Sequence, residues 1–174
     1  QNMSQIPISS AMIVGKEFGF TSPTNESQFW LQRYGDQEIS QFRGAEMIAD
    51  KWDITREDME RFALASNQRA FAAIRGGHFD NEIIAVDGFA VDETPRETTL
   101  EKMAALPVLS EGGRMTAAVA SQICDGASAV LLASEQAVKD HGLKPRARIH
   151  HISCRGADPV FMLTGPIPAT RYAL

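Results

Sequence analysis

The chain has 174 residues, of which 44% are hydrophobic and 22% charged, and its formal net charge is −5. This composition argues against intrinsic disorder, because there is enough apolar surface to offset the entropy of ordering the chain. The negative charge gives no general attraction for phosphate backbones, so nucleic-acid binding is not expected. The longest apolar run, residues 127–133, is far shorter than the roughly 20 residues of a membrane-spanning helix.

The amino end and the cysteines indicate a cytoplasmic protein without a bound metal. Residues 1–5 contain neither the basic nor the apolar region of a signal peptide. Cys124 and Cys154 have no close spacing, so they predict neither a disulfide framework nor a zinc site. Because position 1 is Gln rather than Met, we expect a fragment or a processed start.

The first half of the chain predicts an irregular segment followed by two helices. Residues 1–40 are rich in Gly, Ser, Pro, Asn and Gln, which predicts irregular structure whose aromatic side chains need a partner surface. Apolar residues sharing one face predict a short helix at residues 44–52. The clearest helix follows: Thr55 is a good N-cap, Asp58 completes a near capping box, and Gly76 supplies the stop.

The next elements are a hairpin and a third helix. Residues 83–91 alternate around Asp87-Gly88, a dipeptide favoured in tight primed turns, and therefore predict a hairpin. Residues 96–105 favour a helix that stops before Pro107.

The last sixty residues have the pattern of alternating strands and helices that is typical of an α/β protein. The apolar run at 127–133 and the alternation at 148–153 each predict a strand, the first of them buried. Between them, residues 135–141 favour a helix closed by Gly142. Residues 167–174 look like a helix that the chain terminus cuts short.

One segment, Thr116-Ala-Ala-Val-Ala-Ser-Gln-Ile-Cys-Asp-Gly-Ala-Ser-Ala-Val130, resembles a family motif. The motif is that of the thiolases, written T-A-G-N-(S/A)-S-x-x-(N/S)-D-G-A-A-A. Further anchors that resemble thiolase segments occur in the family order: Asn2-Met-Ser4, Arg96-Glu-Thr-Thr-Leu-Glu-Lys-Met103, Gly156-Ala-Asp-Pro159 and Gly165-Pro-Ile-Pro-Ala169. The ordered set covers essentially the whole chain but less than half of a full thiolase.

The resemblance implies an α/β, thiolase-like fold of which this chain is a part. Residues 1–113 resemble the mostly helical loop domain, which in thiolases binds coenzyme A and makes oligomer contacts. Residues 114–143 resemble the end of the amino-terminal half, and residues 144–174 the truncated start of the carboxy-terminal half. In the family, the catalytic cysteine lies upstream of these segments and the catalytic histidine downstream. We therefore expect no catalytic residue here and no activity from this chain alone.

The same resemblance assigns four residues to coenzyme A or its acyl group. Ser121 matches the serine that hydrogen-bonds the pantetheine arm, and Ala117 falls where a small residue permits close approach of that arm. Arg96 resembles the loop-domain arginine near the nucleotide, with a register uncertain by one residue. Met162 matches a methionine that lines the acyl pocket.

The chain departs from the family pattern at several positions. Ala118 and Val119 stand where the family commonly has Gly-Asn, and Gln122 stands where some members have Gly. Losing the glycine restricts the backbone, and losing the asparagine removes a donor and an acceptor. Residues 38–42 replace the Y-H-M-G segment of biosynthetic members, which favours a degradative thiolase or an atypical acyl specificity.

Each assignment has a plainer alternative. The plainer interpretation of Ser121 is a helix cap or a packed small residue, that of Arg96 is a surface charge, and that of Met162 is a core residue. Cys124 reads as a buried small hydrophobe rather than as a nucleophile.

The resemblance implies an acyl-CoA acyltransferase that cleaves 3-ketoacyl-CoA with coenzyme A, or runs the reverse condensation, through an acyl-cysteine intermediate. Coenzyme A would be a substrate rather than a tightly bound cofactor, and the parent would be a homodimer or homotetramer. The alternative is a non-catalytic thiolase-like module that serves assembly or ligand binding.

Overall fold

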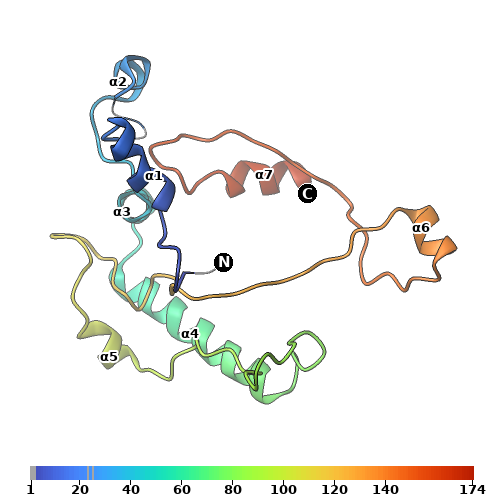
Figure 1. Ribbon diagram of the computed structural model, residues 1–174. Helices are drawn as coiled ribbons and strands as arrows, with labels where there is room; N and C mark the ends of the chain where they lie inside the picture. Colours follow the sequence, from blue (N-terminus) through green and yellow to red (C-terminus); the bar gives the residue numbers. More distant parts are fainter. Residues whose placement is uncertain (1–2, 23, 25) are drawn as a thin grey trace. The chain divides into compact units, whose positions relative to one another are not determined.

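The computed structural model describes residues 3–22, 24 and 26–174 (Figure 1). The chain divides into two compact units, and each is taken by itself below. The central unit is Thr24–Ile123, and the terminal unit combines the segments before and after it, up to residue 23 and Cys124–Leu174. No helix in the described residues is long and apolar enough to cross a membrane.

The longest helix of the central unit is α4 (Arg56–Arg75), as the capping pattern predicted. The Thr55 hydroxyl accepts a hydrogen bond from the backbone N–H of Asp58 at 3.1 Å, and Asp58 Oδ2 accepts one from the N–H of Thr55 at 3.0 Å. This reciprocal pair satisfies two N–H groups that an uncapped helix leaves without partners. The helix ends before Gly76, and Gly77 then adopts a φ of 70°.

Helix α3 (Gln41–Lys51) confirms the helix expected at residues 44–52, but it begins three residues earlier. The reason is Ser40, whose hydroxyl accepts from the N–H of Arg43 at 3.1 Å and so caps a turn that the apolar pattern did not reveal. Gly44 and Ala49 are the buried residues of this helix.

The expectation of irregular structure throughout residues 1–40 was wrong. Three short helices form there: α1 (Ser10–Val14), the 3-10 helix η1 (Gly15–Phe18) and α2 (Gln28–Tyr34). Helix α2 begins at a side-chain cap, since the Ser27 hydroxyl accepts from the N–H of Trp30 at 3.3 Å. For α2, a favourable cap therefore outweighs the polar composition of the sequence.

Of the predicted hairpin, only the turn forms. Val86 and Phe89 exchange two backbone hydrogen bonds of 3.0 and 2.9 Å, and between them Asp87 and Gly88 have φ values of 50° and 87°. Both central residues thus occupy the left-handed region, as a primed turn requires. No ladder continues beyond this single bridge in the residues described, and Ile84 is 85% exposed.

Helix α5 (Leu100–Ala104) is shorter than the helix expected at 96–105 and packs beside α4 (Figure 1). The Thr99 hydroxyl caps its first turn, accepting from the N–H of Lys102 at 3.3 Å. Met103 of α5 is 2% exposed and is one of the few fully buried large side chains among the described residues.

The terminal unit contains α6 (Glu135–Asp140) and α7 (Pro166–Ala173), close to the predicted helices. Helix α6 begins after a Ser134 cap, and Pro166 occupies the first turn of α7, where its missing N–H costs nothing.

The two strands expected at 127–133 and 148–153 do not form. Val130, Leu131 and Leu132 are 82%, 79% and 72% exposed, so the first segment is not buried either. A strand must hydrogen-bond a neighbouring strand, and the described residues supply no neighbour for either segment.

Candidate functional site

The segment that precedes the Thr116–Val130 motif is anchored to α3 by one carboxylate. Glu46 Oε1 accepts the backbone N–H of Arg114 at 2.7 Å and that of Met115 at 2.8 Å. One turn further along α3, Asp50 binds the guanidinium of Arg114 at 2.7 Å. One helix therefore holds both the backbone and the side chain of this short segment.

The same segment folds back on itself just before the motif. Val108 and Thr116 form an isolated antiparallel bridge, and the N–H of Leu109 donates to the carbonyl of Met115 at 2.8 Å. Thr116 is fully buried, whereas Ala117, the next residue, is exposed. The chain thus passes from a fixed, buried position to an open one within a single residue.

Ser121 is exposed and lies in a stretch without regular secondary structure. It caps no helix and is not a packed core residue, so neither of the two plainer interpretations describes it. Between Ala117 and Ser121 the backbone turns once, where the N–H of Val119 donates to the carbonyl of Thr116 at 3.1 Å.

Arg96 is held at both its backbone and its side chain. Its N–H donates to Asn67 Oδ1 at 2.8 Å, and the Asn67 amide nitrogen donates to the carbonyl of Ala63 in α4 at 3.0 Å. Its guanidinium donates to Gln122 Oε1 at 3.1 Å, and the Gln122 amide nitrogen donates to the carbonyl of Thr94. Gln122, the residue that follows Ser121, therefore connects the Arg96 side chain to the motif segment.

The predicted site residues fall into two groups. Arg96, Ala117 and Ser121 all belong to the central unit, and the Arg96–Gln122 bond joins the segments that carry the first and the last of them. Met162 belongs to the terminal unit, where it is 40% exposed and has a φ of 55°. Its role as a residue that lines the acyl pocket stays a prediction from the resemblance.

Sequence reasoning missed two residues that organise this region. Gln122 was noticed only as a departure from the family pattern, with no role attached. Glu46 carried no signal, because a glutamate on an amphipathic helix is most often a solvated charge. Only its bonds to Arg114 and Met115, 68 and 69 positions away, reveal it.

In the terminal unit, the Asp125-Gly126 part of the motif contacts the amino-terminal anchor. The N–H of Ser4 donates to Asp125 Oδ1 at 2.9 Å, while Asn2, in the same anchor, lies outside the described residues. The hydroxyl and then the N–H of Ser4 hold the pKa of the Asp125 carboxyl below its usual value.

Both cysteines are free and exposed, so the reading of Cys124 as a buried small hydrophobe was wrong. The apolar run that follows it forms no core, and this leaves the thiol at the surface. Among the residues with described positions, no three His, Cys, Asp or Glu side chains gather closely enough to hold a metal ion.

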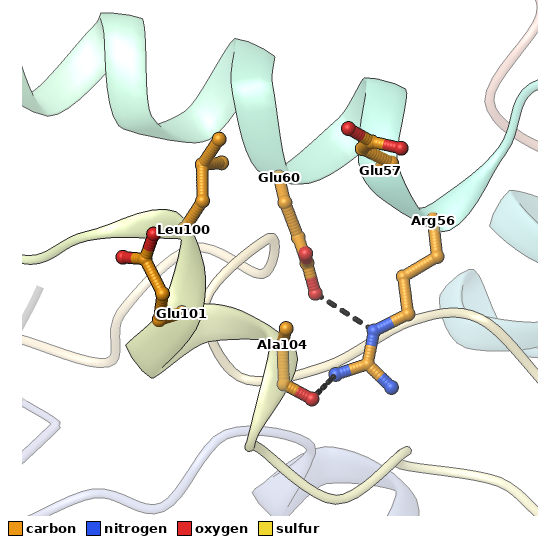
Figure 2. Close-up of a pocket in the computed structure, with 6 residues that line it drawn as sticks. All are labelled: Arg56, Glu57, Glu60, Leu100, Glu101 and Ala104. Atoms are coloured by element: carbon orange, nitrogen blue, oxygen red, sulfur yellow. Dashed lines mark hydrogen bonds and ion pairs between the residues drawn. The ribbon is translucent and has the colours of Figure 1, made fainter.

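A pocket lies between α4 and α5, but it is built as a structural brace (Figure 2). The Arg56 guanidinium donates to three carbonyls near the end of α5, those of Met103, Ala104 and Leu106, at 3.1, 3.0 and 2.9 Å. Its Nε also binds Glu60 Oε1 at 2.7 Å. These bonds, made by Nε and Nη2, make Arg56 a cap for the carboxyl end of α5 and an ion-pair partner of Glu60.

The other lining residues add nothing that points to a ligand, and none of the four predicted site residues borders this pocket. The pocket is completed by Glu57, Leu100 and Glu101. The Thr99 hydroxyl, by hydrogen bonding, lowers the pKa of the Glu101 carboxyl.

Comparison with known proteins identifies relatives over most of the chain. Residues 3–136 match the family described as Thiolase, N-terminal domain. The chain is 76% identical over 178 aligned residues to steroid 3-ketoacyl-CoA thiolase FadA6 of Mycobacterium tuberculosis, an alignment that covers 100% of this chain and 44% of that protein. It is 45% identical over 142 residues to a 3-ketoacyl-CoA thiolase of Psychrobacter cryohalolentis, covering 75% of this chain and 36% of the relative.

Solved structures agree with these sequence matches. Human mitochondrial 3-ketoacyl-CoA thiolase in complex with CoA superimposes with a TM-score of 0.73 at 43% identity, covering 76% of this chain and 35% of that one. A Bacillus anthracis acetyl-CoA acetyltransferase gives 0.71 at 37% identity, covering 79% and 37%. The expected fold class, part of an α/β thiolase-like protein, is confirmed, although its two strands do not form here. The chain spans less than half the length of the relatives it matches.

Proposed function

Because this chain belongs to the thiolase family, we propose that it forms the coenzyme A side of an acyl-CoA C-acyltransferase. The enzyme would cleave a 3-ketoacyl-CoA with free coenzyme A through an acyl-cysteine intermediate. The 76% identity to a steroid 3-ketoacyl-CoA thiolase supports a degradative enzyme whose acyl group derives from a steroid. The bacterial relatives support a cytoplasmic location.

The observation that carries the proposal is the anchored segment from Ala117 to Ser121, whose two end residues are exposed. Glu46 fixes the chain just before it, and the Gln122–Arg96 hydrogen bond holds the chain just after it. An exposed hydroxyl can donate to and accept from the amide groups of a pantetheine arm, and a methyl side chain leaves room for that arm. A guanidinium suits the phosphates of the nucleotide end. Held this way, the nucleotide tail supplies binding energy that positions the reacting thioester.

The remaining assignments follow from the same family membership. Residues 1–113 would form the loop domain, with coenzyme A and oligomer contacts, residues 114–143 the end of the amino-terminal half, and residues 144–174 the start of the second. Met162 would line the acyl pocket, and the whole enzyme would be a homodimer or homotetramer. The nucleophilic cysteine and the histidine base would come from outside these 174 residues.

The proposal is tested by titrating coenzyme A into the source protein, in the length in which the cell makes it, using isothermal titration calorimetry. We expect Arg96→Ala and Ser121→Ala each to weaken binding about tenfold, the loss of one hydrogen bond to a charged or polar group. Arg61→Ala is the matched control, because Arg61 lies on an exposed face of α4 with its partner Glu57. Unchanged affinity in both site variants would remove the proposed site.

Turnover separates the enzyme from the alternative assembly module. We expect the source protein to thiolyse steroid-derived 3-ketoacyl-CoA, and the 174-residue chain to show no turnover. Thiolysis by the 174-residue chain alone would contradict the missing nucleophile and point first to Cys124. Binding of coenzyme A without turnover in a source protein of the same mass as this chain would favour the non-catalytic module.

A further inference from the structure

We propose that Glu46 is a positioning residue for the coenzyme A segment, acting through the backbone of Arg114 and Met115. The inference rests on the proposed function, since it assumes that Ala117 and Ser121 contact coenzyme A. One carboxylate oxygen accepts both N–H groups, at 2.7 and 2.8 Å. Charge-assisted bonds of this length are roughly twice as strong as bonds between neutral groups.

The geometry explains why this anchor acts on the segment rather than on the fold in general. Met115 is followed by the fully buried Thr116 and then by the exposed Ala117. Consecutive Cα atoms are about 3.8 Å apart, so the carboxylate fixes backbone only two residues from the predicted ligand contact. A misplacement of about 1 Å at such a position is enough to cost on the order of a hundredfold in a positioned reaction.

Gly113 provides a second, independent way to disturb the same anchor. A Cβ placed on Gly113 would lie 2.6 Å from Glu46 Oε1 and 3.1 Å from the carbonyl oxygen of Ser110. The backbone there does not have a positive φ, so the restriction is steric and not conformational. Gly113→Ala would therefore push the carboxylate away from the two N–H groups while leaving the charge at position 46 in place.

Asp50 offers a matched control on the same helix. It contacts the same residue, Arg114, but through the side chain, and its own side chain is 69% exposed. Exposed ion pairs contribute little, so Asp50→Asn removes a charge one helical turn from Glu46 without releasing the backbone.

Backbone amide exchange tests the anchor directly. In Glu46→Ala and Gly113→Ala we expect the amides of Arg114 and Met115 to exchange roughly tenfold faster or more, because each loses a charge-assisted acceptor. Glu46→Gln keeps an acceptor oxygen and should restore most of the protection, and Asp50→Asn should match wild type. Exchange in α4 should stay unchanged in all four variants, which shows that the fold persists. If exchange becomes faster throughout α3 and α4, and does so in Glu46→Gln as well as in Glu46→Ala, the inference is overturned. Glu46 would then be a general stabiliser of the fold.

Coenzyme A binding by the source protein completes the test. We expect Glu46→Ala and Gly113→Ala to raise the dissociation constant about tenfold, Glu46→Gln to recover most of the affinity, and Asp50→Asn to leave it unchanged. If wild type binds coenzyme A and Glu46→Ala binds it equally well, the inference fails and the proposed function stands. If wild type binds no coenzyme A, the proposed function itself fails.

Discussion

The central unit and the terminal unit differ in how extensively each is bonded internally, although they belong to one chain. In the central unit, side chains bond to backbone far away in sequence: Arg56 reaches Leu106, and Glu46 reaches Arg114. In the terminal unit, large apolar side chains stand in solvent. Among them are Val130, Leu131, Leu132, Ile149 and Ile152, from the two segments expected to be strands, at 61–82%.

The difference reflects how helices and strands satisfy their backbone hydrogen bonds. A helix satisfies its backbone hydrogen bonds internally, so α4 needs only its cap and one packed neighbour. A strand has no internal partner, so an apolar run suited to a sheet stays without regular structure until another strand is beside it. The central unit is rich in the first kind of element, whereas the two apolar runs of the terminal unit, residues 127–133 and 148–153, suit the second. Three substitutions, two of them with a matched comparison, test this contrast.

The largest effect is expected where the central unit is most tightly bonded. Arg56→Ala removes the donors to three carbonyls around the end of α5 and leaves Glu60, which is 4% exposed, without its ion-pair partner. We expect the free energy of unfolding, measured by urea titration with circular dichroism, to fall by about 3 kcal/mol.

The control is Arg61→Ala on the same helix. Its ion pair with Glu57 is more than 60% exposed on both sides, so a loss below about 0.5 kcal/mol is expected. Equal losses in the two variants would mean that the bonds of Arg56 contribute no more to the free energy of unfolding than an exposed ion pair does.

A smaller effect is expected at the amino end of α4. Thr55→Ala removes the cap and should lower the free energy of unfolding by about 1 kcal/mol in the same assay. A cost near zero would show that packing against α5 alone maintains the first turn.

The same variant should alter the response to acid. The hydroxyl and then the N–H of Thr55 hold the pKa of the Asp58 carboxyl below its ordinary value of 3.8. A lowered folded-state pKa stabilises the fold above the ordinary value, and this contribution disappears as pH falls through the lower folded value. Wild type should therefore lose α4 helicity in that acidic range more steeply than Thr55→Ala, as a circular dichroism titration would record.

The smallest effect is expected in the terminal unit. Leu131→Ala should change the free energy of unfolding by less than about 0.5 kcal/mol, because Leu131 is 79% exposed. Met103→Ala is the matched deletion in the central unit and should cost about 3 kcal/mol, since Met103 is 2% exposed. A cost at Leu131 similar to that at Met103 would erase the contrast between the two units.

The features predicted from sequence are those that depend on near neighbours. Helix α4 follows from Thr55, Asp58 and the glycines after it, all within one or two turns of the helix ends. The Asp87-Gly88 turn is equally local, and it forms even though the flanking strands do not. The strand at 127–133 was predicted wrongly. An apolar run indicates a preference for burial, but it does not indicate which other segment would pair with it as a neighbouring strand.

The candidate site divides in the same way. Ala117 and Ser121 could be named because a contiguous motif carries them. The residues that hold that motif, Glu46 on α3 and Gln122 beside Ser121, could not be named. Their partners are separated from them by 26 to 69 positions, and periodicity or composition contains no trace of such pairings.

The two free thiols make this chain convenient for spectroscopy. Both cysteines of the sequence are exposed, and both belong to the terminal unit, at positions 124 and 154. A maleimide dye pair attached to this 174-residue chain would therefore label that unit alone and leave the helices of the other unmodified. Energy transfer between the dyes would then report the distance between the two ends of the 124–154 stretch. It would also report whether that distance shortens when a partner chain binds.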